Sequence, residues 1–247
     1  MRAKLAQIVR EEKFRKKRMA KVQRRRHLAP LYRKMDNQGV VVGELCALCG
    51  VNQASTRDHV PPKAIFPKPW PALITVPACF ECNNSASDLD DLFKVYLSMH
   101  TAGNNEIARQ LFTEKTVRTL RRNQNLLQRI HKESRRVPIR NKQGELESRL
   151  GVLWDSNAHT EVIGRTIRGL YFHHSGSPLP SDCELKVQWL RGVPEEIVPK
   201  LPLFEEQVIG ENQVVYKYAI APEDPRHSLW LFEFYGAHWA SGYTSQA

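Results

Sequence analysis

Four cysteines stand in two pairs, and each pair has the spacing Cys-x-x-Cys: Cys46 with Cys49, and Cys79 with Cys82. Such a segment forms a tight turn that points two thiolates at one ion. Two segments therefore supply the four sulfur ligands of a tetrahedral structural zinc site. The 29 residues between the pairs, 50–78, exceed the loop of about 15–20 residues that is usual there. We therefore expect the intervening segment to carry functional residues in addition to connecting the two pairs of zinc ligands.

Asp58 and His59 are the candidates for chemistry within this segment, and Asn83 follows directly on the last cysteine. A histidine titrates near neutral pH and can accept a proton from water. Carboxylate and amide oxygens are ligands that select a hard cation such as Mg²⁺ or Mn²⁺. An Asp-His dipeptide is common by itself, so its place between two cysteine pairs and ahead of Pro61-Pro62 is what makes it informative.

The pattern C-x2-C, D-H-x-x-P, C-x2-C-N resembles the HNH endonucleases, the ββα-metal nucleases, in a form stapled by zinc. The resemblance covers roughly residues 44–100. It implies that His59 is the general base and that Asp58 and Asn83 bind a single catalytic Mg²⁺ or Mn²⁺. It also implies that a structural Zn²⁺ is bound by Cys46, Cys49, Cys79 and Cys82.

One position departs from the family pattern, because the middle Asn is absent where Pro71-Ala72-Leu73-Ile74-Thr75 stands. In the family this Asn generally braces the hairpin and does not bind metal. The resemblance implies a metal-dependent endonuclease that hydrolyses DNA phosphodiester bonds, and RNA stays open as a substrate. The alternative is a zinc-stapled nucleic-acid-binding protein that does not cleave. The absent Asn and the net charge of −3 over residues 37–108 favour this alternative.

The net charge of +11 is spread unevenly, since residues 1–36 hold 14 Lys and Arg against three acidic residues. Residues 109–150 carry a further +8, and residues 151–247 carry −5. Basic segments beside a nuclease-like core favour a polyanion as the partner. A solvated arm is the alternative for residues 1–36. The candidates for phosphate binding are Lys16, Lys17, Arg18, Arg24, Arg25, Arg26, Lys63, Arg118, Arg121 and Arg122.

The chain is expected to belong to the α+β class, with a ββα core stapled by zinc, flanking helices and a small C-terminal α+β domain. The expected division is a basic arm or helix at 1–36, a nuclease core at 37–103, a basic helical segment at 104–150 and an α+β domain of unknown role at 151–247. A turn at 141–145 marks the last boundary.

Within the core we expect strands at 55–60 and 73–76 and a helix from the second cysteine pair. The apolar positions of residues 89–97 repeat with helical spacing, and Ser87 with Asp90 resembles an N-cap. One long helix is expected over 104–133. In the C-terminal domain we expect a helix at 160–171 and strands at 184–190, 213–221 and 228–236.

The sequence also bears on the compartment. No apolar run approaches the ~20 residues that a membrane span needs. The first residues lack the apolar centre of a secretion signal. Cysteines in metal-type pairs fit reduced thiols better than disulfides. These observations predict a cytoplasmic protein with no membrane partner.

Overall fold

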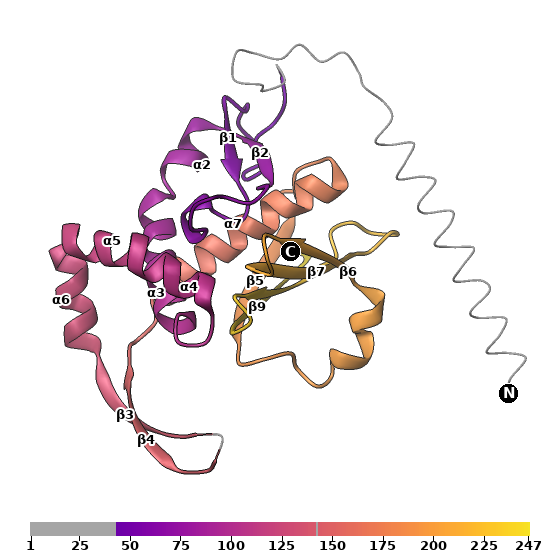
Figure 1. Ribbon diagram of the computed structural model, residues 1–247. Helices are drawn as coiled ribbons and strands as arrows, with labels where there is room; N and C mark the ends of the chain where they lie inside the picture. Colours follow the sequence, from indigo (N-terminus) through magenta and orange to yellow (C-terminus); the bar gives the residue numbers. More distant parts are fainter. Residues whose placement is uncertain (1–42, 142) are drawn as a thin grey trace, which may run out of the picture. The chain divides into compact units, whose positions relative to one another are not determined.

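The two Cys-x-x-Cys pairs flank a short antiparallel hairpin in the computed structural model of the chain (Figure 1). The hairpin joins β1 (Thr56–His59) to β2 (Thr75–Ala78). The prolines at 61 and 62 follow β1, and they end it because proline has no N–H for a further ladder bond. The connection contains a 3₁₀ helix, η1 (Lys63–Ile65), and β2 leads into α2 (Phe80–Asn84). Both strands and the helix lie within two residues of their expected bounds.

The structure describes residues 43–141 and 143–247. Residues 43–247 form one compact unit. The arm at 1–36 lies outside the described residues. So do its candidates for phosphate binding, Lys16, Lys17, Arg18, Arg24, Arg25 and Arg26.

Helix α3 (Ser87–Thr101) presents the predicted apolar positions to the core, where Phe93 and Leu97 are fully buried. The predicted N-cap is wrong. The helix begins at Ser87 itself, and the residue ahead of it, Ala86, makes no capping bond with its side chain. Asp90 instead pairs with an arginine of a distant helix, as described below.

The expected single helix over 104–133 is wrong in its continuity. The segment consists of α4 (Glu106–Leu111), a π-helical turn η2 (Phe112–Thr116), α5 (Val117–Arg122) and α6 (Gln124–Glu133). Asn123 separates the last two helices, and its side chain accepts the N–H of Leu126 at 3.0 Å. An Asn at this position caps a new helix because its oxygen satisfies one of the free N–H groups of the first turn.

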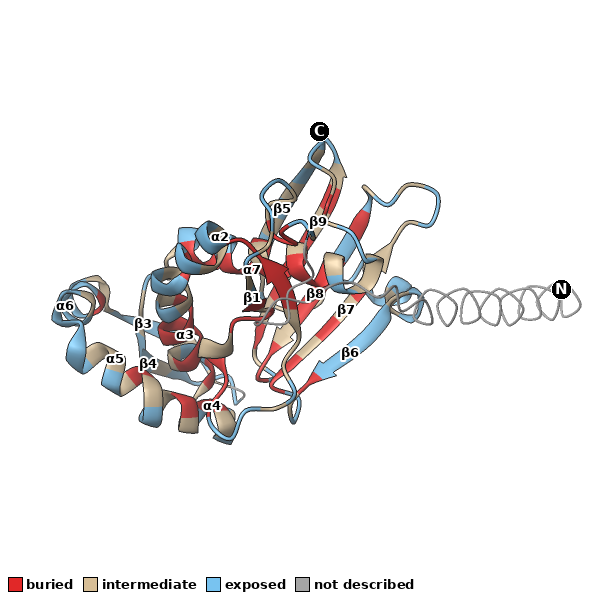
Figure 2. Ribbon diagram, turned by 90° about the horizontal axis from the view of Figure 1, so that it is seen from above, coloured by how far each residue is buried: buried red, intermediate tan, exposed pale blue. Residues whose placement is uncertain are grey.

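The expected turn at 141–145 is found, but it joins two strands that the sequence analysis did not expect. β3 (Arg135–Arg140) and β4 (Leu146–Gly151) form an antiparallel ribbon. Figure 1 shows this ribbon extending away from the helices, and Figure 2 shows that most of it is exposed. Pro138 is tolerated within β3 because a two-stranded ribbon leaves the outer N–H groups unpaired.

The last part of the chain combines α7 (Ser156–Ser175) with an antiparallel sheet. α7 is capped by the Asp155 side chain, and Gly176 ends it at a φ of 78°. The helix and the three strands expected here are all found. The strands follow the order β5 (Cys183–Leu190), β9 (His238–Gln246), β8 (Ser228–Phe234), β7 (Val214–Ile220) and β6 (Glu205–Ile209), and a 3₁₀ helix η3 (Val198–Leu203) lies between β5 and β6. The α+β class is confirmed.

A continuous cluster of buried side chains joins these parts. Phe93 of α3 contacts Phe234 of the sheet edge to face, and Ile163 and Ile167 of α7 are fully buried in the same cluster. Figure 2 shows the buried residues concentrated between α3, α7 and the strands of the sheet. The core therefore links the hairpin end of the chain to its C-terminal half.

None of the helices in the described part of the chain combines the length and the apolar character that a bilayer crossing requires.

Candidate metal centre and catalytic residues

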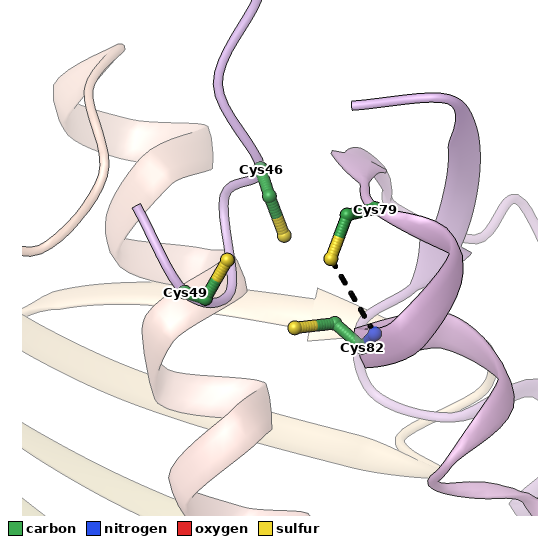
Figure 3. A group of neighbouring side chains, drawn as sticks. All are labelled: Cys46, Cys49, Cys79 and Cys82. Carbon is green, nitrogen blue, oxygen red and sulfur yellow. Dashed lines mark hydrogen bonds between the residues drawn. The ribbon is translucent and has the colours of Figure 1, made fainter. Parts of the chain in front are cut away.

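Figure 3 shows the four cysteines converging on one point. Cys46 and Cys49 come from the loop ahead of β1, and Cys79 and Cys82 come from the start of α2. The four sulfur atoms all lie within 4.8 Å of one another. Sulfurs at about 2.3 Å from one Zn²⁺ in a tetrahedron are about 3.8 Å apart. The cysteines therefore stand together as predicted, and their cluster can hold a metal ion such as Zn²⁺.

Backbone amides face the sulfurs in both cysteine turns. The N–H of Leu48 donates to Cys46 Sγ at 3.4 Å, and the N–H of Cys82 donates to Cys79 Sγ at 3.5 Å. In the first turn Gly50 has a φ of 69°, a conformation that favours glycine, and its N–H donates to the Cys46 carbonyl at 2.8 Å. Donors of this kind stabilise the thiolate form of cysteine.

The electrostatics of the cluster favour a bound cation. Burial raises the pKa of Cys46, and burial together with the neighbouring thiols raises the pKa of Cys82. Burial also acts to raise the pKa of Cys49, but the backbone amides of Asn52 and Val51 outweigh it and lower that pKa to about 7. Four thiolates can share this small volume once a cation neutralises them, which couples metal binding to folding.

Asp58 is buried, with an exposed fraction of 8%. Its Oδ1 accepts the backbone N–H of His59 at 2.7 Å, and its Oδ2 has no hydrogen-bond partner among the described residues. A buried carboxylate oxygen is unfavourable unless a charged group or an ion balances it. The charge on Asp58 Oδ2 therefore has to be balanced by a cationic group or an ion.

Arg165 of α7 places a positive charge beside that oxygen. Its Nε lies 3.7 Å from Asp58 Oδ2, and its Nη2 donates to Asp90 Oδ1 in α3. All three side chains are less than one-fifth exposed. Burial raises the pKa of both carboxyl groups, to about 6 at Asp90, while Arg165 acts in the opposite direction. This ion triad ties β1, α3 and α7 together.

Arg165 is not among the site residues expected from the sequence. The available signal is its place in α7, since its neighbours in the chain, Gly164 and Thr166, are both buried. A charged residue within a buried helical run is rarely left without a partner. That signal marks Arg165 as paired, but it does not say which carboxylates pair with it.

His59 ends β1 and is half-buried. Burial lowers its pKa and the Lys63 ammonium lowers it further, while Asp58 acts to raise it. Because the pKa falls below its ordinary value of 6.5, the imidazole is neutral at pH 7 and can accept a proton.

Arg57 of β1 forms hydrogen bonds across the hairpin to Thr75, at the beginning of β2. Its Nε donates to Thr75 Oγ1 at 3.1 Å and its Nη2 donates to the Thr75 carbonyl at 2.9 Å. Thr75 pairs with His59 across the hairpin and belongs to the segment that lacks the expected Asn. Arg57 therefore holds the beginning of β2 in place. Arg57 was not expected at the site, because it is exposed and no motif includes it.

Asn83 lies in α2, which Cys79 caps by accepting the N–H of Cys82. Its Nδ2 donates to Thr56 Oγ1 at 3.0 Å and to the Arg57 carbonyl at 3.3 Å. The Asn83 amide nitrogen thus donates to β1 twice. The structure brings Asn83 against the strand that carries Asp58 and His59.

The remaining candidates lie on two elements. Lys63 begins η1 shortly after His59, and its ammonium lies 3.5 Å from the centroid of the Trp70 ring. The side chains of Arg118, Arg121 and Arg122 are exposed on α5. Exposure is compatible with phosphate contacts, and these contacts stay a prediction.

Comparisons of the chain with protein-family models, with curated proteins and with solved structures gave no match, so the candidate site is interpreted from its residues and geometry.

Proposed function

We propose that this protein is a metal-dependent endonuclease of the HNH type that hydrolyses DNA phosphodiester bonds. One observation carries the proposal: the Asn83 amide is hydrogen-bonded to the strand that bears Asp58 and His59. An imidazole that is neutral at pH 7, a buried carboxylate and an amide thus belong to one hairpin–helix unit, residues 43–84. The resemblance of these residues to HNH endonucleases supports the same function.

Phosphodiester hydrolysis is slow because a hydroxide must approach an anion and an alkoxide must leave. The His59 imidazole takes the proton from the attacking water as general base. Asp58 and Asn83 would hold a Mg²⁺ or Mn²⁺ ion, and that ion would supply positive charge to offset the charge of the phosphate and the leaving oxygen. The four cysteines hold Zn²⁺ and fix the ends of the unit.

A second candidate function is binding of nucleic acid without cleavage. One observation favours it: the Arg165 guanidinium already lies 3.7 Å from Asp58 Oδ2, where it neutralises part of the charge that would attract a cation. In this case the hairpin–helix unit is a structural platform for the basic segments. The two functions differ in whether DNA is cut.

The test is incubation of the full chain with supercoiled plasmid and Mg²⁺ or Mn²⁺, and in parallel with EDTA. Zinc content is measured after each incubation, so that loss of activity is not confused with loss of zinc. We expect metal-dependent cleavage, and we expect His59→Ala to lower the rate by about 10²–10⁴, the usual contribution of a general base.

The matched control is His131→Ala, because His131 lies on the exposed surface of α6. This variant should cleave at the wild-type rate. Full activity of His59→Ala would remove His59 from the mechanism. DNA binding without cleavage under every metal condition would favour the second function.

A further inference from the structure

Three lysines converge on Trp70, whose side chain is 43% exposed. The Nζ atoms of Lys63, Lys68 and Lys115 lie 3.5 Å, 4.8 Å and 5.9 Å from the centroid of its ring. Lys63 follows β1, Lys68 lies in the loop before β2, and Lys115 belongs to the π-helical turn η2. Three separate segments thus bring positive charge to one aromatic ring, which attracts cations through its negative face.

Hydrogen bonds between the loop and the helices hold this arrangement. Lys115 Nζ donates to the Phe66 carbonyl at 2.5 Å, and Gln110 Nε2 donates to the Lys68 carbonyl at 3.2 Å. A π-helical turn adds one residue to a helical turn, and such turns are frequent at functional sites. Here the π-helical turn η2 contains Lys115, whose ammonium reaches the loop at Phe66.

The charges of the cluster are not balanced by acidic side chains. Among the described residues, no carboxylate pairs with Lys63, Lys68 or Lys115. The nearby Asp91 forms its ion pair with Lys94, at 2.6 Å. Ammonium groups that repel one another at a partly exposed ring are stabilised by an anion that contacts several of them at once.

We propose that Lys63, Lys68, Lys115 and Trp70, the Trp70 cluster, bind the phosphodiester backbone of a nucleic acid beside the bond that is cut. The lysines contact phosphate oxygens, and Trp70 is a positioning residue that holds the ammonium groups in place. Lys63 lies four residues after His59, and its ammonium is near enough to lower the pKa of the His59 imidazole. This inference rests on the proposed function and names the surface that receives the substrate strand.

The experiment measures DNA binding by the full chain in the His59→Ala background, so that cleavage does not interfere. A fluorescent duplex of about 20 base pairs is titrated at several salt concentrations. Each phosphate contact contributes about −0.9 to the slope of log affinity against log salt. The double substitution Lys68→Ala and Lys115→Met should therefore flatten the slope by roughly 2, and should weaken binding to unrelated sequences equally.

The matched control is Lys186→Ala with Lys200→Ala, which removes the same charge from exposed positions on β5 and η3. The salt slope of this control should lie closer to the parent slope than the slope of the Trp70-cluster variant does. Because Lys115 is partly buried, Lys68→Ala alone is measured as well, with an expected change of about 1 in the slope. Trp70→Phe should keep the binding that Trp70→Leu loses, since a ring and not bulk holds the ammonium groups.

The outcomes separate the two proposals. If the parent protein binds DNA and the Trp70-cluster variants bind with the same affinity and salt slope, the inference is overturned and the proposed function stands. If the parent protein does not bind DNA, both are overturned. Binding of poly-glutamate is measured in the same way. If the cluster variants bind poly-glutamate more weakly than the parent protein but bind DNA equally well, the surface recognises an acidic protein and the inference is again wrong.

Discussion

The hairpin–helix unit, residues 43–84, and the C-terminal half, residues 156–247, are stabilised by different means. The sheet of the C-terminal half buries large aromatic side chains, among them Tyr216, Trp230 and Phe232. The hairpin–helix unit has two strands of four residues each and a helix of five. A unit of this size cannot bury enough apolar surface to fold by itself, and small units usually depend on a metal or a partner.

Both means are open to the hairpin–helix unit. Its four cysteines can hold a metal ion, and it also contacts the C-terminal half. Val60 packs directly against Gly169 of α7, and the Tyr235 hydroxyl donates to the Ile65 carbonyl. Arg165 adds the ion triad with Asp58 and Asp90. The candidate catalytic residues are therefore positioned from two directions, by the cysteine cluster and by a helix about 100 residues further along the chain.

The largest expected effect comes from removing the metal. Cys79→Ser should lose the zinc and unfold the hairpin–helix unit, while α7 and the sheet stay folded. Structural zinc contributes on the order of 10 kcal/mol to folding in small zinc domains. Elemental analysis should find one zinc per wild-type chain, and hydrogen exchange should show loss of protection in residues 43–84.

Cys183→Ser is the control for this change, because Cys183 lies at the start of β5 and outside the cluster. It should keep the zinc and the protection. A Cys79→Ser variant that retains one zinc per chain and a protected hairpin would show that the sulfur cluster does not hold the unit together.

Removal of Arg165 should have the next largest effect. Arg165→Met leaves two buried carboxylates without a cation, and breaking a buried ion pair in this way costs about 3–5 kcal/mol. Urea denaturation should show this loss in the free energy of unfolding. The additional substitution Asp90→Asn should recover part of it, because it removes one of the unpaired charges.

Arg168→Met is the matched control. Arg168 lies one turn further along α7, is half-exposed and forms no ion pair among the described residues. Its substitution should cost less than about 1 kcal/mol. Equal losses for both variants would mean that the ion triad does not connect the two regions.

The contact between Val60 and Gly169 should have a smaller effect. A Cβ added at Gly169 would lie 2.5 Å from Val60 Cγ1, so Gly169→Ala must push α7 away from the hairpin. Overpacking of this kind costs about 1–3 kcal/mol. Thermal unfolding should show the loss, and Val60→Ala in the same chain should reduce it.

Gly192→Ala is the control, since nothing lies within 4 Å of the added Cβ and the position is not strained. Its unfolding temperature should be close to that of the wild type. A Gly169→Ala variant as stable as this control would show that α7 and the hairpin can move apart without cost.

Much of the candidate site could be predicted because its chemistry is local in the sequence. Each Cys-x-x-Cys turn brings two sulfur atoms together within four residues, and the candidates Asp58 and His59 are neighbours in the chain. Arg165 could not be assigned in this way, because its contact with Asp58 spans more than 100 residues and depends on how α7 packs. The pattern of one helix does not contain that information.

The strands show the same limit. β7 and β8 were expected because they are rich in aromatic and β-branched residues. β9 was missed because its buried face is formed by small and polar residues such as Ala240, Gly242 and Thr244. Gly242 allows a close approach, since a Cβ there would lie 2.3 Å from Ile167 Cδ1 of α7 and 3.1 Å from the Lys186 carbonyl oxygen. Because α7 lies close to the sheet, β9 has small residues on its buried face and lacks the apolar residues by which a strand is predicted.

The smallest expected effect concerns acid, to which His159 of the C-terminal half and Asp90 of α3 should respond in opposite senses. In the C-terminal half, His159 and His238 are buried with their Nε2 atoms 3.2 Å apart, and burial lowers the pKa of His159 to about 4. Because this pKa lies below the ordinary 6.5, the unfolded chain binds more protons between the two values. The stability contributed by His159 is complete above pH 6.5 and is lost toward pH 4, at up to about 1.4 kcal/mol per pH unit.

At the ion triad, burial raises the pKa of Asp90 from 3.8 to about 6, so the folded chain binds more protons there and Asp90 adds stability as the pH falls. Urea denaturation from pH 7 to pH 5 should therefore show the stability of His159→Gln falling less steeply than that of the wild type, and the stability of Asp90→Asn falling more steeply. His131→Gln changes an exposed residue and should follow the wild-type curve. Parallel curves for all four proteins would mean that neither His159 nor Asp90 has a pKa that differs between the folded and the unfolded chain.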